Sequence, residues 1–166
     1  LIGTETNLPE KENLSYFGNN NEANWIYNFT LPPLLIHALL FENASYLNIW
    51  SKKLPLTKMG NSYLNFIASH DGIGLRPAKG LLNKEEIKTI TDTMQRFGGE
   101  ISWRTGADGT DRPYEVNITL FSALQGTVEG KDDYAEDRFI CVHVIMLALE
   151  GIPAFYIHSL LATSND

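Results

Sequence analysis

Two carboxylates in this sequence stand where a strand ends and the chain turns. Glu5 and Asp71 each follow an apolar run, His70 precedes Asp71, and two glycines come within three residues after it. Paired carboxylates at one opening suit cleavage of a glycosidic bond, because one can protonate the leaving oxygen while another stabilises or traps the oxocarbenium-like centre. A plain turn, in which Asp71 only caps the backbone, is an equal alternative from these residues alone.

Buried parallel strands are the elements that must position these groups. Residues 63–69 are apolar and aromatic, and the run predicts a strand buried on both faces. Residues 1–4, 25–29 and 151–157 predict further strands, the last of them buried as well. Catalytic groups of α/β folds sit at the carboxyl ends of such strands, so Glu5 and Asp71 are expected to share one opening.

Helices are expected between these strands. The sequence predicts a helix over 31–53, broken near Asn43, another from the N-cap Asn83 to Gly98, and an apolar helix over 133–150. Short strands are expected at 101–103 and 116–121, separated by a polar, turn-rich loop over 106–113. Successive strand–helix units indicate an α/β fold with an inserted section.

Amide and aromatic side chains are expected around the two carboxylates, where they could bind sugar hydroxyls or stack on a sugar ring. A core or rim position is the commoner outcome for any single aromatic residue. The candidates are Asn7, Tyr16, Asn65, Tyr114, Asn117 and Tyr156.

Other chemistries find little support. The four histidines show no metal-ligand spacing, and His37 and His143 are expected in the core, so no metal is expected. The pair Gly72 and Gly74 lacks the third glycine of a dinucleotide fingerprint, and no G-x-S-x-G occurs. We therefore expect no cofactor and no serine nucleophile.

Composition and charge narrow the classes of partner and the cellular location that the chain fits. A net charge of -7 with scattered Lys and Arg argues against nucleic acid, and no apolar run could cross a membrane. The one cysteine, Cys141, is expected in the core, and the lack of a disulfide framework favours a reducing, cytoplasmic location. Four Asn-x-Ser/Thr triplets are interpreted as chance matches.

Four segments resemble glycoside hydrolase family 13, the α-amylase family. Phe66-Ile-Ala-Ser-His-Asp71 is similar to its fourth signature region, and Ser69-His-Asp-Gly-Ile-Gly-Leu-Arg-Pro77 narrows the resemblance to the sucrose phosphorylase subfamily. Thr4-Glu-Thr-Asn7 resembles the third region, 25–39 resembles strand six and its helix, and 151–166 resembles strand eight with its loop. Residues 5–7, 113–117 and 157–159 look most like the glucosylglycerate phosphorylase branch.

The resemblance implies strands five to eight of a (β/α)8 TIM barrel with a small α+β insertion after strand seven. It divides the chain into residues 1–71 (strands five to seven), 72–132 (the insertion) and 133–166 (helix seven and strand eight). Both ends look cut, so we expect part of a longer protein. Half a barrel leaves sheet edges and an apolar face uncovered, which predicts poor solubility or self-association.

The resemblance also implies roles. Glu5 would be the general acid/base, Asp71 would stabilise the transition state, and His70 would hydrogen-bond the same sugar. Asn7 is a further substrate-binding candidate, and Tyr114 and Glu115 lie in the loop that shapes the acceptor and phosphate site. The implied reaction is retaining transfer of glucose from an α-glucoside to inorganic phosphate, through a covalent glucosyl-enzyme.

Two further points follow from the resemblance. The nucleophilic Asp of the family belongs to strand four, so we expect no turnover by these 166 residues alone. An α-glucoside hydrolase or transglycosylase, and a noncatalytic paralog, are the alternatives. Glycerate, fructose and fructose 6-phosphate are possible acceptors that differ in charge, and Arg76, Arg104 and Arg112 are equal candidates for telling them apart.

Overall fold

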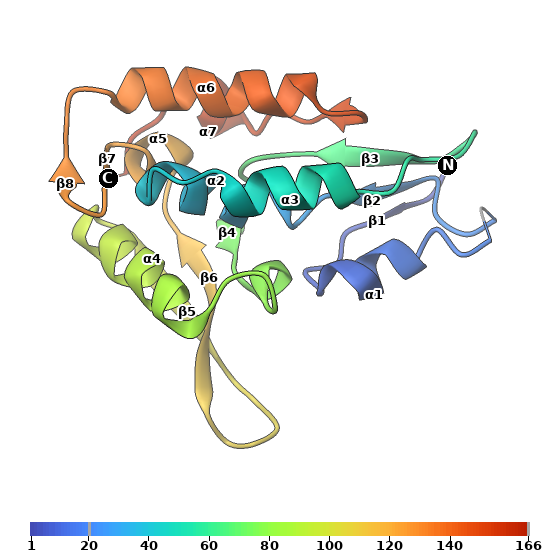
Figure 1. Cartoon of the computed structure of the whole chain (residues 1–166), viewed down its shortest axis with the longest axis horizontal. Coiled ribbons are helices and arrows are strands. Elements are labelled where there is room, and N and C mark those ends of the chain that lie inside the picture. The colour runs from blue at the N-terminus through green and yellow to red at the C-terminus, as the bar shows by residue number, and fades with distance from the viewer. Residues whose placement is uncertain (20, 166) are drawn as a thin grey trace.

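A parallel sheet of four short strands carries the two candidate carboxylates. The computed structural model describes residues 1–19 and 21–165. The strands lie in the order β1-β2-β3-β9, and every neighbouring pair is parallel. Figure 1 shows β1, β2 and β3 running side by side. The fourth strand, β9, pairs with β3 and comes from the far end of the chain. Their bounds are β1 Gly3–Thr4, β2 Trp25–Tyr27, β3 Ser62–Asn65 and β9 Ile152–Pro153.

Helices connect these strands, as parallel pairing requires. The predicted break near Asn43 is confirmed, because two helices occupy this region and Glu42 between them has a φ of +52°. Prolines occupy the first turn of the earlier helix, a position that tolerates them. The helices of the chain are α1 Glu10–Ser15, α2 Leu31–Leu40, α3 Ser45–Lys53, α4 Lys84–Arg96, α5 Leu120–Ala123, α6 Ala135–Ala148 and α7 Ile157–Leu160.

A second, antiparallel sheet stands between β3 and β9 in the chain. It has the order β4-β6-β5, with β4 Ile73–Gly74, β5 Glu100–Thr105 and β6 Asp111–Asn117. In Figure 1 the hairpin of β5 and β6 projects away from the helices. The strand predicted at 116–121 is wrong in its second half, because Thr119 caps the short helix α5 there. A 3-10 turn, η1 Arg76–Ala78, and a small pair, β7 Gly126–Thr127 with β8 Gly130–Lys131, complete the elements.

The predicted N-cap at Asn83 is confirmed. The Asn83 Oδ1 accepts the Glu86 N–H at 2.9 Å, and the Glu86 carboxylate accepts the Asn83 N–H at 2.8 Å. These reciprocal bonds form a capping box, which satisfies two backbone donors at the start of α4. His37 is buried, as predicted, and its Nε2 lies 3.3 Å from Glu86 Oε1.

The main core lies between α2, α4, α5, α6 and β6. Nearly all of α2 is buried, and Leu31 and Leu34 have no exposed surface. From the second sheet Val116 enters the same core, and from α6 it receives Val142 and Met146. The second sheet and the helices therefore share one apolar core, which Ile67 and Ala68 enter just after β3. The buried apolar side chains of the parallel sheet, Ile26 and Tyr63, form a smaller, separate cluster with Ala23.

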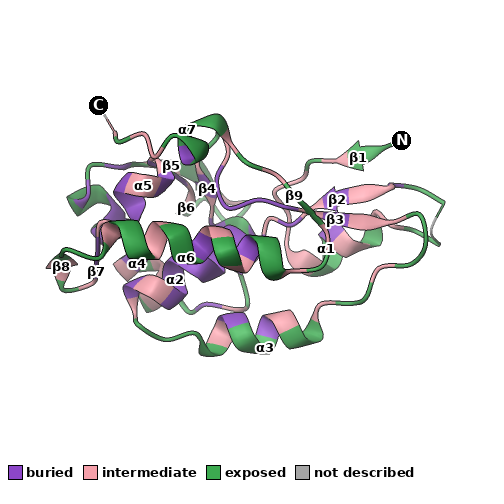
Figure 2. Cartoon of the chain, turned by 90° about the horizontal axis from the view of Figure 1, so that it is seen from above, coloured by how far each residue is buried: buried purple, intermediate pink, exposed green. Residues whose placement is uncertain are grey.

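One side of α6 is not covered. Ile140, Val144 and Leu147, here called the α6 face, are 60%, 58% and 55% exposed. Figure 2 shows exposed residues along much of this helix. The predicted core position of Cys141 is wrong because the residue lies on an exposed side of α6, and His143 is only half-buried. The prediction of a buried strand over 151–157 is also wrong, because only 152–153 are strand and both are exposed at the sheet edge.

Two buried amides cross the parallel sheet. The Asn28 Nδ2 donates to Asn65 Oδ1 at 2.9 Å, and the Asn65 Nδ2 donates to the Glu150 carbonyl at 3.0 Å. Asn65 has no exposed surface and Asn28 is also buried, so both amides depend on these partners. They join the end of β2, the strand β3 and the residue just before β9.

Candidate active site

A cavity of about 300 Å³ opens where β1, β2 and β3 end. Glu5 follows β1 directly, and Asp71 stands six residues after β3. All six predicted site residues line this cavity, although they come from three separate segments of the chain. The lining residues are Glu5, Asn7, Phe29, Ser69, His70, Asp71, Gly72, Gly74, Tyr114 and Glu115.

A tight turn over 69–72 presents Asp71. The Asp71 N–H donates to Ser69 Oγ at 3.3 Å, and the Gly72 N–H donates to the Ser69 carbonyl at 3.2 Å. Gly72 has a φ of +93°, and a Cβ there would lie 2.3 Å from the Val116 carbonyl oxygen. Only glycine fits both the dihedral and the space, so the turn holds Asp71 against the second sheet.

His70 and Asp71 form a pair at the rim of the cavity. The His70 Nε2 lies 3.3 Å from Asp71 Oδ1, and the two side chains are 72% and 58% exposed. Both groups are therefore reachable from solvent, which their predicted role in sugar binding requires. The contact orients the imidazole and the carboxylate toward one another.

A hydrogen bond joins the Glu5 segment to the hairpin. The Asn7 Nδ2 donates to Glu115 Oε1 at 3.0 Å, across 108 residues of sequence. A Cβ at Gly74 would lie 2.8 Å from Asn7 Nδ2, so glycine at this position leaves room for the amide. The end of β1 is thus tied to the sheet that begins directly after Asp71.

The cavity is rich in carboxylates. Burial raises the pKa of Glu115, the Asn7 hydrogen bond opposes that rise, the charge of Asp71 adds to it, and Arg104 lowers it. Burial, followed by the charge of Glu5, raises the pKa of the Tyr27 phenol, whose ring stacks on that of the lining residue Phe29. Three carboxylates, those of Glu5, Asp71 and Glu115, therefore line one cavity.

A β-bulge explains why the neighbours Tyr114 and Glu115 both line the cavity. Consecutive strand residues normally point to opposite faces. Here Ser102 is opposite Glu115, whereas Trp103 is opposite Pro113, which leaves Tyr114 as the extra residue. Bulges re-aim side chains in this way and are common beside active sites. The guanidinium of Arg104 lies over the Tyr114 ring, 5.2 Å from its centroid.

Four of the residues predicted around the carboxylates are elsewhere. Tyr16 packs on the small cluster of Ala23, Ile26 and Tyr63. Asn65 is fully buried in the sheet, and Asn117 donates to Ser102 Oγ at 2.7 Å. Tyr156 packs against the main core. These side chains satisfy structural needs that periodicity alone does not distinguish from sugar binding.

Phe29 and Ser69 line the cavity and were not predicted there. The Phe29 ring centroid lies 5.0 Å from that of Phe66, which fixes the ring at the end of β2. Their positions just after two predicted strands were the signal in the sequence that could have placed them at the cavity. Among residues 1–19 and 21–165, no group of three or more His, Cys, Asp or Glu side chains is arranged to hold a metal ion. No helix in this part of the chain is long and apolar enough to cross a membrane.

Known proteins match most or all of the chain. The glucosylglycerate phosphorylase of Escherichia coli (strain K12) is 43% identical over 167 residues, covering 100% of this chain and 30% of that enzyme. The glucosylglycerate phosphorylase of Spirochaeta thermophila is 42% identical, covering 99% and 28%. The sucrose phosphorylase of Bifidobacterium adolescentis is 31% identical, covering 85% and 28%. No protein-family model matches the chain.

The crystal structure of sucrose 6F-phosphate phosphorylase from Thermoanaerobacter thermosaccharolyticum superposes with a TM-score of 0.80 at 24% identity, covering 99% of this chain and 31% of that one. The fold is therefore that of a partial (β/α)8 barrel. The chain spans about 30% of the length of the curated relatives it matches.

These comparisons confirm the resemblance to the sucrose phosphorylase subfamily of glycoside hydrolase family 13. Within that group, identity to the glucosylglycerate phosphorylases named here, 42–43%, exceeds the 31% to the sucrose phosphorylase. The chain is thus homologous to part of these phosphorylases, and the glucosylglycerate branch is the better match.

Proposed function

We propose that this chain supplies the acid/base and the transition-state-stabilising carboxylate of a retaining α-glucosyl phosphorylase. The enzyme would cleave an α-glucoside with inorganic phosphate and release α-glucose 1-phosphate. The observation that carries the proposal is that Glu5 and Asp71, each on a segment resembling a family 13 signature, line one cavity at the ends of parallel strands. The names of the matched relatives support phosphorolysis, with glycerate as the acceptor of the reverse reaction.

Each lining residue has a role in this proposal. Glu5 protonates the leaving oxygen and later takes the proton of the incoming phosphate. Asp71 binds hydroxyls of the glucosyl ring and stabilises the oxocarbenium-like transition state. His70, held beside Asp71, donates a hydrogen bond to the same sugar. Asn7, Tyr114 and Glu115 shape the part of the cavity that the second substrate enters.

The nucleophile that would form the glucosyl-enzyme is assigned by the family resemblance to barrel strand four. We equate β1, β2, β3 and β9 with barrel strands five to eight, so strand four lies outside these residues. Residues 72–132 would then be an insertion after strand seven, flanked by barrel segments at 1–71 and 133–166. The antiparallel order β4-β6-β5, interposed between β3 and β9, supports this division. A single cysteine fits a cytoplasmic location.

The test uses the full-length protein with α-glucose 1-phosphate and, separately, D-glycerate, fructose or fructose 6-phosphate. Acceptor-dependent release of phosphate is expected, with glycerate the best acceptor. Release of phosphate and free glucose that does not depend on an acceptor would mean hydrolysis instead. The 166 residues by themselves are expected to give no turnover, because the proposed nucleophile is not among them.

Two variants connect the activity to the cavity. Glu5→Gln and Asp71→Asn are each expected to lower kcat by roughly 10²- to 10⁴-fold, the usual range for such groups. Glu12→Gln makes the same chemical change on the exposed side of α1 and should leave kcat unaltered. A Glu5→Gln enzyme with wild-type kcat would refute the assignment of the acid/base.

A further inference from the structure

We propose that Arg104, stacked on Tyr114, binds the anionic group of the second substrate at the rim of the cavity. That group is inorganic phosphate in one direction and the carboxylate of an anionic acceptor, such as glycerate, in the other. The inference deepens the proposed function and rests on it. It selects one of three arginines that the sequence left equal.

The charge of the cavity makes such a cation necessary. Three carboxylates, those of Glu5, Asp71 and Glu115, line it, and no Lys or Arg is among the lining residues. A dianionic phosphate or a carboxylate that approaches this lining is repelled unless a positive charge compensates. The His70 ring already contacts the Asp71 carboxylate, so any positive charge on it compensates Asp71 before it compensates a bound anion.

The geometry of the hairpin brings Arg104 to the cavity. Ser102 is opposite Glu115, so the two side chains share one face of the hairpin, and Arg104 is two residues further along the same strand. The bulge adds Tyr114 to this face, and the guanidinium lies over its ring at 5.2 Å. Arg104 is therefore anchored to a lining residue, whereas its side chain is exposed to an incoming ligand.

In the described part of the chain, the donors of Arg104 are not used elsewhere. Within residues 1–19 and 21–165 its guanidinium makes no hydrogen bond or ion pair with another side chain. A guanidinium offers five N–H donors in a planar fork that matches a carboxylate or phosphate in bidentate fashion. The Tyr114 ring holds this fork in place, which lowers the entropy cost of binding.

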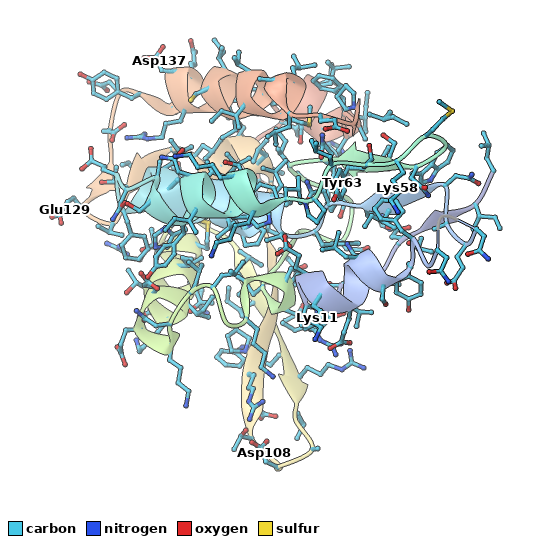
Figure 3. The ribbon with its side chains drawn as sticks, turned by 45° about the vertical axis from the view of Figure 1, so that its right-hand side comes forward. Lys11, Lys58, Tyr63, Asp108, Glu129 and Asp137 are labelled. Atoms are coloured by element: carbon cyan, nitrogen blue, oxygen red, sulfur yellow. The ribbon has the colours of Figure 1, made fainter. Side chains whose placement is uncertain are left out.

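The other two arginines lack this placement. Arg112 is the direct cross-strand partner of Arg104, but its guanidinium pairs with Asp108. Figure 3 shows Asp108 at the tip of the hairpin, away from the rest of the molecule. Arg76 is exposed in η1 and has no aromatic or ion-pair contact in the described part of the chain that would fix it at the cavity.

The experiment separates charge recognition from catalysis by using a donor without phosphate. The full-length protein is given α-glucosyl fluoride, and glucosyl transfer is measured to inorganic phosphate, to D-glycerate and to the uncharged acceptor glycerol. Arg104→Ala is expected to raise KM for phosphate and for glycerate by about 10- to 100-fold, the usual loss for a charge-assisted hydrogen bond. KM for glycerol should change less than threefold. Arg104→Lys keeps the charge but loses the planar fork of donors, so its KM values for the two anions should lie between those of wild type and Arg104→Ala.

Arg112→Ala is the matched control, because it removes the same charge from the neighbouring position of the same hairpin. It should leave all three KM values near wild type. A rise confined to phosphate would assign the site to phosphate, and a rise confined to glycerate would assign it to the acceptor carboxylate. An equal loss for glycerol, or no change for either anion, would overturn the proposal.

Failure of the proposed function would be visible separately. If the wild-type protein hydrolyses α-glucosyl fluoride without transfer to phosphate, or does not react with it, phosphorolysis is refuted. Calorimetric titration of wild type and Arg104→Ala with phosphate and with D-glycerate then tests the anion site without turnover. Equal affinities of the two proteins for both anions would overturn the Arg104 assignment on its own.

Discussion

The cavity and the α6 face are both surfaces of this chain, but they differ in what the chain supplies to them. At the cavity, residues from the segment after β1, from the turn after β3 and from the hairpin meet, and the Asn7–Glu115 hydrogen bond links segments far apart in sequence. At the α6 face, three large apolar side chains are more than half exposed. Within residues 1–19 and 21–165, polar side chains from distant segments thus come together at the cavity, whereas the α6 face stays exposed.

The difference shows that one stretch of sequence can bring polar side chains together in a cavity and still leave an apolar helix side exposed. Each polar contact of the cavity acts over a short distance between two side chains, so it forms once the two segments that carry them are folded together. An apolar helix side gains its stability from area removed from water, and this requires a second surface of similar size. Substitutions at the cavity and at the α6 face should therefore have different effects.

The largest effect is expected where the cavity depends on a glycine. Gly72→Ala introduces a Cβ at a φ of +93° and 2.3 Å from the Val116 carbonyl oxygen. Strain at the dihedral costs about 1–3 kcal/mol, and the backbone collision adds to it. Gly80→Ala is the matched control, because its φ is +85° but no atom lies within 4 Å of the added Cβ. Urea unfolding of the two variants should show a larger loss at Gly72, and equal losses would contradict the close approach.

A smaller effect is expected at the α6 face. The 166-residue chain should self-associate, and Val144→Lys with Leu147→Lys should weaken that association about tenfold or more by removing apolar contact area. Lysine is a good helix former, so α6 itself should persist. Ile49→Lys, on α3, replaces an equally exposed residue outside this face. Sedimentation velocity measures the three proteins, and a monomeric wild type would break the comparison.

The smallest effect concerns the pH dependence of stability. Because burial raises the pKa of Glu115 in the folded state, the folded protein binds this proton more tightly than the unfolded chain does. The resulting stability is present below the unfolded pKa, near 4.5, and is lost as the pH rises through the raised folded value. Glu115→Gln keeps an oxygen that can accept the Asn7 N–H. In urea unfolding between pH 4 and 7, it should flatten the slope of the unfolding free energy against pH. An unchanged slope would show that Glu115 is not the group responsible.

Local signals in the sequence predicted much of the fold correctly. The Asn83 N-cap and the break near Asn43 depend on nearby residues, and both are present. The four predicted parallel strands are present too, but each is shorter than predicted. The helix α1 was missed in a segment rich in Asn, Gly and Ser. It depends on a distant contact, because Trp50 of α3 donates a hydrogen bond to Glu10 in its first turn.

The candidate site was predictable in its strand-end residues and less so in the rest. Glu5 and Asp71 follow apolar runs, which is a signal visible in sequence. The bulge at Tyr114 depends on how two strands pair, and a one-residue shift in register leaves no trace in composition. Arg104 could not be separated from Arg112 for the same reason, whereas their different partners separate them in the structure.

The buried pair Asn28 and Asn65 has a consequence for how the chain finds its structure. Strands of two to four residues offer few backbone hydrogen bonds, so several misaligned pairings would be nearly equal in energy. A slip of β3 by one residue would turn the Asn65 amide away from Asn28 and leave two desolvated amides unpaired. The amides therefore favour the correct strand register during folding, because only that register satisfies both of them. Asn65→Leu should add apolar packing but make misaligned pairing of β3 more frequent.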